Sequence, residues 1–382
     1  MHVVMCAETF TPAVNGVVNS VRQVAGCLRE AGHDVTVLAP TGTTFDTPGG
    51  PVPVVTVPSV AVPGYRSLRV ARPGVDVRRA LYDLRPDVVH LASPALLGQA
   101  AVQAATVIER PAVAVFQTDL AAFVARHRAG IPVPARTREG LRARTWRWLR
   151  EIHNAADLTL APSRPTLAQL EAQRFERLAV WPRGVDSERF HPRHRDRATR
   201  EELLGGRRLL VGVVARLAAE KRIELLAAAA RHPDIRVVVV GDGPLRHALE
   251  RTLPEATFTG QLTGPELGRV VASLDVLAHP GADETFCQSV QEGLSAGVPA
   301  VVAASGGPLD LVTDGVNGRL WHDDDPATLA GLLAGLRDDA ERSRLAAAAR
   351  ASVVHRSWTS VTDQLLGHFT ALTAGAPRRR VA

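Results

Sequence analysis

Lysine is almost absent from this sequence. The chain of 382 residues carries 45 lysine and arginine residues, and only Lys221 among them is a lysine. Arginine presents a planar fork of donors, whereas lysine is a compact point charge on a flexible stem. Because nearly every basic position is arginine, the one retained lysine is a candidate for a specific charge contact.

Cysteines and aromatic residues are also scarce. Cys6, Cys27 and Cys287 have neither metal-type spacing nor the pattern of a disulfide framework, which predicts a reducing, cytoplasmic setting. Aromatic residues make up 4% of the chain and apolar residues 46%, so the core must be aliphatic. We expect no signal peptide, because the chain opens on a predicted strand at His2–Ala7. We expect no membrane span, because no apolar run approaches about 18 residues.

The charge balance is basic, with a formal net charge of +6 and a pI of about 10.1. Such a balance fits nucleic acid, an anionic membrane surface or anionic small ligands. The sequence contains no recognisable nucleic-acid-binding module. We therefore predict a basic enzyme with anionic ligands and no nucleic-acid partner.

Short apolar runs alternate with helical patterns along the whole chain. Most runs are continuous in valine, alanine and leucine, as in parallel strands buried on both faces. The strands expected in the first half are His2–Ala7, Asp34–Ala39, Val52–Val57, Asp87–Leu91, Ala112–Phe116, Asp157–Ala161 and Ala179–Pro182. Those expected in the second half are Leu209–Ala215, Ile235–Val240, Thr257–Thr259, Val276–Ala278 and Ala300–Ala303. This predicts an α/β protein with two doubly wound, Rossmann-like domains.

We place the domain boundary in the proline- and charge-rich stretch 181–204. The predicted units are an N-terminal domain (1–185), a C-terminal domain (186–355), a crossover helix (356–374) and a disordered basic tail (375–382). Open parallel sheets bind ligands beyond the carboxyl ends of their strands. We therefore expect the ligand in a cleft between the two domains.

The second domain offers charged residues after two of its strands. Arg216 and Lys221 follow the strand that ends at Ala215, where two cations can meet a diphosphate. Glu284 follows a later strand, and Glu292, in the next helix, can accept bonds from a ribose diol. Free N–H groups at the loop–helix junction suit a phosphate. These N–H groups belong to Thr285, Phe286, Cys287 and Gln288.

The first domain offers weaker candidates. Asn15 and Gly16 open a helix after the first strand, where a phosphate could approach the backbone closely. The same residues fit an ordinary strand–helix turn without a ligand equally well. Gln117 and Asp119 follow another strand and could reach a sugar hydroxyl. Asp119 could equally cap the next helix.

Two further clusters have less specific interpretations. The acids 323–325 precede a helix that begins with proline, so we interpret them as a helix cap and predict no metal site. The stretch Arg126–Arg150 contains eight arginines and one acid. If 138–155 is helical, Trp146 lies between Arg142 and Arg150 on an exposed face. That face suits either an anionic membrane surface or solvent.

Together the motifs resemble the family 4 glycosyltransferases of GT-B fold, especially the actinobacterial GDP-mannose-dependent α-mannosyltransferases. The resemblance covers nearly the whole chain. Its marks are residues 7–20, 116–119, 181–186, 215–221, 241–244, 284–288 with Glu292, and 306–308. Two positions depart from the family pattern: Gln117 often corresponds to a histidine, and Ala215 to a glycine.

The resemblance implies a retaining transfer of a hexose, favouring mannose from GDP-mannose, to a hydroxyl acceptor, with a glycolipid favoured. Arg216 and Lys221 would bind the donor diphosphate, with the backbone of Gly16 against the same phosphates. Glu284 would contact the donor sugar and Glu292 the ribose. The nucleotide sugar is a co-substrate, so neither cofactor nor metal is implied. Because glutamine is no base, proton transfer by Gln117 is not expected.

Other functions remain open on the sequence alone. A UDP-sugar-dependent transferase with a soluble natural-product or cyclitol acceptor uses the same motifs. A nucleotide-sugar epimerase shares the fold, and a pyridoxal-phosphate phosphorylase would need Lys221 for its Schiff base. A non-catalytic nucleic-acid-binding protein would use the arginine-rich stretch instead.

Overall fold

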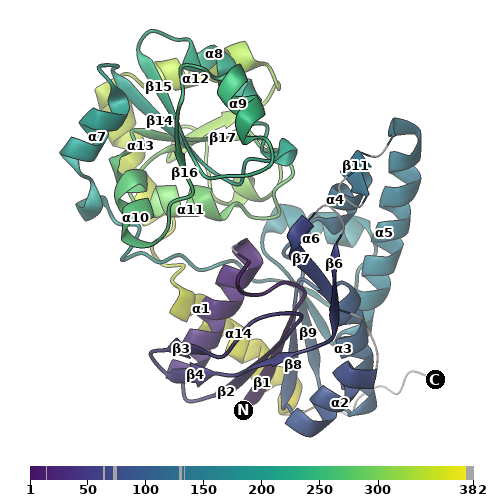
Figure 1. The fold of residues 1–382 in the computed structure, drawn as a ribbon. Helices are drawn as coiled ribbons and strands as arrows, with labels where there is room; N and C mark the ends of the chain where they lie inside the picture. Colours follow the sequence, from purple (N-terminus) through teal and green to yellow (C-terminus); the bar gives the residue numbers. More distant parts are fainter. Residues whose placement is uncertain (14, 63–64, 72–74, 129–130, 133, 376–382) are drawn as a thin grey trace. The chain divides into compact units, whose positions relative to one another are not determined.

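The computed structural model describes residues 1–13, 15–62, 65–71, 75–128, 131–132 and 134–375. The chain divides into two compact units (Figure 1). Unit 1 comprises Met1–Gly184 and the segment from Trp358 onward, and unit 2 comprises Val185–Ser357. From residue 376 on, the predicted basic tail lies outside the described residues.

Unit 1 is built on a seven-stranded sheet in the order β13-β12-β9-β8-β1-β2-β5, with all neighbours parallel. The strands are β1 (His2–Ala7), β2 (Asp34–Ala39), β5 (Val54–Thr56), β8 (Val88–Ala92), β9 (Ala112–Val115), β12 (Leu158–Ala161) and β13 (Leu178–Val180). Three small hairpins accompany it: β3 (Phe45–Thr47) with β4 (Gly50–Val52), β6 (Ser59–Val62) with β7 (Tyr65–Ala71), and β10 (His127–Arg128) with β11 (Ile131–Pro132).

The helices of unit 1 include the returning C-terminal helix α14. They are α1 (Gly16–Glu30), α2 (Val75–Leu84), α3 (Leu96–Val107), α4 (Leu120–Arg126), α5 (Ala135–Ala155), α6 (Arg164–Ala172) and α14 (Trp358–Thr373). Helix α14 lies beside α1 (Figure 1) and buries Val361, Leu365 and Phe369 in the core of this unit. The indole N–H of Trp181 donates to the carbonyl of Val361 at 2.7 Å. Helix α14 therefore completes the hydrophobic core of unit 1, although it follows unit 2 in the sequence.

A buried carboxylate lies in unit 1 at the point where the strand order reverses, between β1 and β8. Glu8 follows β1, and its carboxylate accepts bonds from the N–H groups of Ala95 at 2.6 Å and Gly98 at 2.8 Å. Burial raises the pKa of Glu8, although these N–H groups oppose the shift. The N-terminus of α3 is thus satisfied by the protein's own anion.

Unit 2 has a six-stranded parallel sheet in the order β16-β15-β14-β17-β18-β19. The strands are β14 (Leu209–Val214), β15 (Ile235–Val240), β16 (Thr257–Gly260), β17 (Val276–His279), β18 (Ala300–Ala303) and β19 (Gly318–Trp321). This is the doubly wound order of a Rossmann fold, with the reversal between β14 and β17. The prediction of two Rossmann-like α/β domains is confirmed.

The helices of unit 2 cover this sheet (Figure 1). They are α7 (Arg197–Leu204), α8 (Ala227–Ala230), α9 (Arg246–Thr252), α10 (Gly264–Ser273), α11 (Gln288–Ser295), α12 (Pro326–Gly335) and α13 (Asp339–Ala351), with short 3₁₀ turns at Pro192–His194, Ala219–Lys221, Ile223–Leu226 and Gly307–Asp310. Asp325 caps α12 by accepting from the N–H of Ala327 at 3.1 Å. The helix-cap interpretation of the acidic run is confirmed at this residue.

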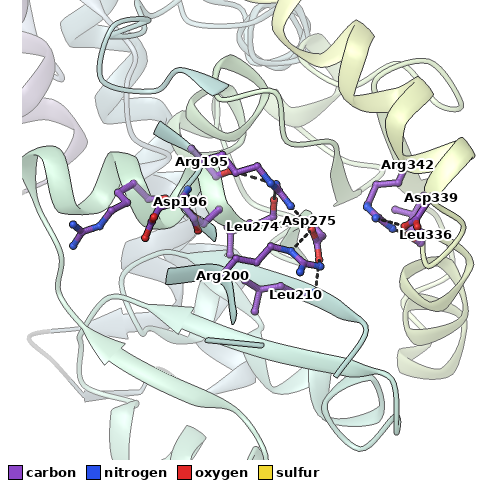
Figure 2. Close-up of polar contacts among 12 residues, drawn as sticks. Arg195, Asp196, Arg200, Leu210, Leu274, Asp275, Leu336, Asp339 and Arg342 are labelled. Carbon is purple, nitrogen blue, oxygen red and sulfur yellow. Dashed lines mark hydrogen bonds and ion pairs between the residues drawn. The ribbon is translucent and has the colours of Figure 1, made fainter. Parts of the chain in front are cut away.

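A buried aspartate fastens the amino ends of β14 and β17 (Figure 2). The Asp275 side chain is fully buried, and it pairs with Arg195 and Arg200, each at 2.7 Å. It also accepts from the N–H of Leu210 in β14 at 2.9 Å. Burial alone would raise the pKa of Asp275, but these partners outweigh it and lower the pKa. The contacts join β14, β17 and α7 at the edge opposite the strand ends that carry Arg216 and Glu284.

We predict that Asp275→Asn lowers the free energy of unfolding of unit 2 by about 3 kcal/mol, because two arginines lose their buried anion. Chemical denaturation followed by circular dichroism measures this. Asp339→Asn is the matched control, since Asp339 pairs with Arg342 but its side chain is 86% exposed. The control should change stability by about 0.5 kcal/mol or less. Equal effects of the two substitutions would contradict the buried role of Asp275.

Candidate active site

The candidate site lies in unit 2 beyond the carboxyl ends of β14 and β17, where the strand order reverses. Arg216 and Lys221 follow β14, and Glu284 follows β17. Open α/β sheets bind their ligands at this reversal, because the loops of the two adjacent strands diverge there. The structure therefore brings Lys221 into contact with Glu284, which lies 63 positions further along the sequence.

Both cations of the site are held by carboxylates. Lys221 Nζ forms a short ion pair with Glu284 Oε1, and both side chains are largely buried. Arg216 pairs with Glu220 at 2.6 Å, and its side chain is half exposed. Lys221 is thus a fixed charge inside the site, while Arg216 lies at its rim.

His279, the last residue of β17, joins the Lys221–Glu284 pair. Its ring Nε2 lies 3.1 Å from Glu284 Oε1. Burial alone would lower the pKa of His279, but Cys287 and Glu284 outweigh it and raise the pKa to about 10. Burial would raise the pKa of Glu284, but Lys221 and His279 lower it to about 2. The Glu284 carboxylate therefore holds two nitrogen groups at the carboxyl end of β17, the Lys221 ammonium and the His279 imidazole.

Glycines let the neighbouring strand-end loops pack against the loop of Arg216 and Lys221. A Cβ on Gly241 would lie 1.9 Å from the Ala215 carbonyl oxygen, and one on Gly243 would lie 2.5 Å from that of Leu217. The Leu217 N–H donates to the carbonyl of Asp242 at 3.0 Å. The Gly-Asp-Gly-Pro turn after β15 is thus the backbone support of the cationic loop.

The loop of Glu284 is supported in the same way by the turn after β18. The N–H of Gly307 donates to the Glu284 carbonyl at 2.7 Å. A Cβ on Gly307 would lie 2.3 Å from Phe286 Cα, and one on Gly306 would lie 2.5 Å from the Glu284 carbonyl oxygen. Only glycine lets the two loops approach this closely.

The residues after Glu284 form the start of α11. Phe286 is buried in the core of unit 2, so it anchors the loop. Cys287 occupies the N-cap position of α11 with a left-handed backbone, φ 82°. Thr285, Gln288 and Glu292 are half-buried beside this helix start. A helix therefore begins within the candidate site, and its free N–H groups can bind an anion.

The candidates of the first half lie in unit 1. Asn15 caps α1 by accepting from the N–H of Val18 at 3.0 Å, and Gly16 is the first residue of that helix. The Gly16 carbonyl accepts a short hydrogen bond from Arg183. Asp119 accepts from the N–H of Ala122 at 2.8 Å, which is the capping role that the sequence left open.

Gln117 and Trp146 are both buried in unit 1. Gln117 follows β9 and is 7% exposed. Trp146 is 5% exposed and stacks on Phe116 with ring centroids 5.6 Å apart. The prediction of an exposed Trp146 between arginines is therefore wrong, because the helix turns this position toward an aromatic cluster.

Sequence reasoning assigned no role to His279 or to the side chain of Cys287. His279 is a polar residue that ends an otherwise apolar strand, which was the available signal. The approach of Cys287 to His279 depends on its left-handed backbone, and no local sequence pattern gives that conformation at a non-glycine residue.

Comparison with known proteins identifies the class. The profile described as Glycosyltransferase Family 4 matches residues 14–189, and that described as Glycosyl transferases group 1 matches residues 194–352. Two GDP-mannose-dependent alpha-mannosyltransferases are similar over nearly their whole length. That of Corynebacterium glutamicum is 40% identical, covering 99% of this chain and 91% of the relative. That of Mycolicibacterium smegmatis is 43% identical, covering 97% and 98%.

Solved structures agree with this class in fold. Sucrose-phosphate synthase from Thermosynechococcus elongatus superposes with a TM-score of 0.80 at 19% identity, covering 98% of this chain and all of that one. Anabaena HepE with UDP-glucose gives 0.76 at 18% identity, covering 97% and 100%. The fold is that of a GT-B glycosyltransferase. The chain belongs to glycosyltransferase family 4.

We predict that Gly307→Ala displaces the loop that carries Glu284, because the added methyl group meets backbone atoms that cannot rotate away. Sugar transfer should fall at least about tenfold and stability by about 1–3 kcal/mol. Gly331→Ala is the control, since Gly331 in α12 has no neighbouring atom within 4 Å of the added carbon. Unchanged transfer by Gly307→Ala would show that the loop position does not matter.

Proposed function

We propose that this protein transfers mannose from GDP-mannose, with retention of configuration, to a hydroxyl group of a glycolipid. The observation that carries the proposal is the Lys221–Glu284–His279 cluster, with Arg216 at its rim, beyond the reversal point of the unit 2 sheet. The naming of mannose rests on the full-length similarity to the two α-mannosyltransferases.

Charge favours a diphosphate at this site. Lys221 supplies a largely buried ammonium, and Arg216 can turn from Glu220 toward solvent because half of its side chain is exposed. A partly buried ammonium interacts with a phosphate more strongly than one in bulk water. Lys221 and Arg216 would therefore hold the donor diphosphate between them.

The same contacts would favour bond breaking. As the bond between the anomeric carbon and the phosphate oxygen breaks, negative charge accumulates on the departing diphosphate. Fixed cations stabilise that charge more in the transition state than in the bound donor. The acceptor hydroxyl then attacks from the same face of the sugar, and its proton passes to a phosphate oxygen. Gln117 takes no proton in this scheme.

The remaining contacts follow the family resemblance. Glu284 would accept bonds from the sugar hydroxyls and Glu292 from the ribose. Backbone N–H groups at the start of α11 would bind phosphate oxygens, as helix N-termini commonly do. Since Lys221 and Arg216 supply the positive charge, transfer would need no resident metal or cofactor.

The proposed acceptor is a lipid because α5 presents a basic surface. Its buried side carries Thr145, Trp146, Leu149, Ile152 and His153, and the opposite side carries the exposed residues Arg136, Arg144 and Arg147. Such a face attracts anionic headgroups without inserting into the bilayer. None of the helices in the described part of the chain is both long and apolar enough to cross a membrane. From the exposed arginines of α5 alone we propose peripheral binding at the cytoplasmic membrane face.

We predict that Lys221→Ala lowers kcat about 10²–10³-fold with GDP-mannose, corresponding to about 3–4 kcal/mol of lost transition-state stabilisation. Lys221→Arg should restore only part of the rate, because a planar fork does not reproduce a point charge. Arg197→Ala is the control, since that side chain is 91% exposed and pairs with Glu201. Near-full turnover by Lys221→Ala would refute the proposal.

The identity of donor and product is tested with wild-type enzyme, a panel of nucleotide sugars and an acceptor lipid extract. Mass spectrometry should show a hexose added to lipid from GDP-mannose, and NMR should show an α-linkage. Faster transfer from UDP-sugars to a soluble cyclitol would favour the alternative transferase. Epimerised donor without acceptor would favour an epimerase.

We predict that the double substitution Arg144→Glu with Arg147→Glu reduces recovery on anionic liposomes at least about tenfold, because the net charge of this surface falls by four units and each arginine near an anionic membrane contributes about 1 kcal/mol. Flotation at physiological salt measures this. The charge-matched control is Arg231→Glu with Arg251→Glu, both exposed in unit 2. Equal losses in the two double variants would indicate a general charge effect rather than an α5 surface.

A further inference from the structure

Three side chains of different chemistry converge beside Lys221. His279 ends β17, Glu284 lies in the following loop, and Cys287 caps α11. One ligand atom from each, an imidazole nitrogen, a carboxylate oxygen and a thiol sulfur, lies within 4.8 Å of the other two. His279 is 2% exposed and Cys287 is 5% exposed, so both residues are buried.

This set of ligands matches zinc rather than magnesium or calcium. Zinc binds cysteine sulfur, histidine nitrogen and carboxylate oxygen at about 2.0–2.3 Å, which puts tetrahedral ligands about 3.5 Å apart. The three ligand atoms would therefore need to close by no more than about 1.3 Å. Magnesium and calcium prefer oxygen ligands, and a thiol disfavours them.

We propose that His279, Glu284 and Cys287 form a zinc-binding site inside the donor pocket, and that zinc and the nucleotide sugar exclude each other. The exclusion rests on the proposed function, whereas zinc binding itself does not. Three protein ligands leave a fourth coordination position for water, as in open zinc sites. Zinc on Glu284 removes the carboxylate that holds Lys221 and that would contact the donor sugar. The metal is therefore an inhibitor of this enzyme and not its cofactor.

The neighbouring Lys221 ammonium does not forbid the metal. Histidine and cysteine bind zinc in their deprotonated forms, so metal binding releases protons from the site. Zinc on Glu284 would replace that carboxylate's ion pair with Lys221. Glu220, in the same loop as Lys221, is the other carboxylate that acts on this ammonium.

The binding test uses the full chain after treatment with EDTA, with zinc alone as the probe. Calorimetry should give one zinc per chain, and Cys287→Ser and His279→Gln should each weaken binding at least about 100-fold. Co²⁺ in place of zinc should give a thiolate-to-cobalt charge-transfer band that Cys287→Ser abolishes. Cys27→Ser, in unit 1, is the control and should retain both signals. Mg²⁺ should not bind at this site.

The proposal is overturned if zinc binding is unchanged in both ligand variants, or if cobalt shows no thiolate band in the wild-type protein. Far-ultraviolet circular dichroism in EDTA checks that each variant is folded. Should Cys287→Ser fail to fold, His279→Gln and the cobalt spectrum of the wild type still decide the question.

The competition test adds GDP-mannose to the zinc titration. The apparent zinc affinity should fall in proportion to donor concentration, and transfer activity should fall with zinc and recover with EDTA. If zinc binds with the same affinity in the presence and absence of bound GDP-mannose, zinc and the nucleotide sugar do not exclude each other. Zinc binding as described without transfer from any donor would instead refute the proposed function and leave the metal site standing.

Discussion

The ion pair between Lys221 and Glu284 is the contact on which the site depends. It joins the loop after β14 to the loop after β17, the two adjacent strands between which the order of the sheet reverses. At the other end of the same strands, Asp275 and its two arginines join β14, β17 and α7. Each end of the strand pair is thus held by charge. The two ends differ in what lies beside them, because the loop of Glu284 at the carboxyl end leads into the start of α11, where backbone N–H groups can bind an anionic ligand.

The two units differ at the point where the strand order of each sheet reverses. In unit 1 the carboxylate of Glu8 occupies the N-terminus of α3, so the place where a phosphate would bind is filled by the protein. In unit 2 the corresponding edge presents Lys221 and the start of α11. This contrast supports the proposal that the anionic donor binds to unit 2. Glycines at 241, 243, 306 and 307 then let the supporting turns approach the two site loops.

Much of this arrangement could be predicted from the sequence. The features that could not be predicted depend on contacts between residues far apart in the chain or on strands without a clear pattern. Continuous apolar runs predicted the parallel strands except β19, since both faces of such a sheet are buried. The strand β19 was not predicted, because its four residues include Gly318 and Arg319 and form no apolar run. The hairpins β3–β4, β6–β7 and β10–β11 were not predicted either, because their strands are very short or, in β7, carry arginines among the apolar residues. Arg216, Lys221 and Glu284 were predicted as site residues because they directly follow the strands β14 and β17. The approach of Cys287 to His279, and the burial of Trp146, depend on tertiary packing that local spacing does not encode.

A single lysine permits a direct test of the central claim. Protein labelled with ¹⁵N at lysine Nζ contains one labelled ammonium group, that of Lys221. Titration with GDP-mannose should shift its NMR resonance saturably, and the dissociation constant should equal the one obtained by calorimetry. GDP should give a similar shift, because the diphosphate is the proposed contact, and free mannose should give none. A Lys221 resonance that stays unchanged while calorimetry detects donor binding would contradict this account.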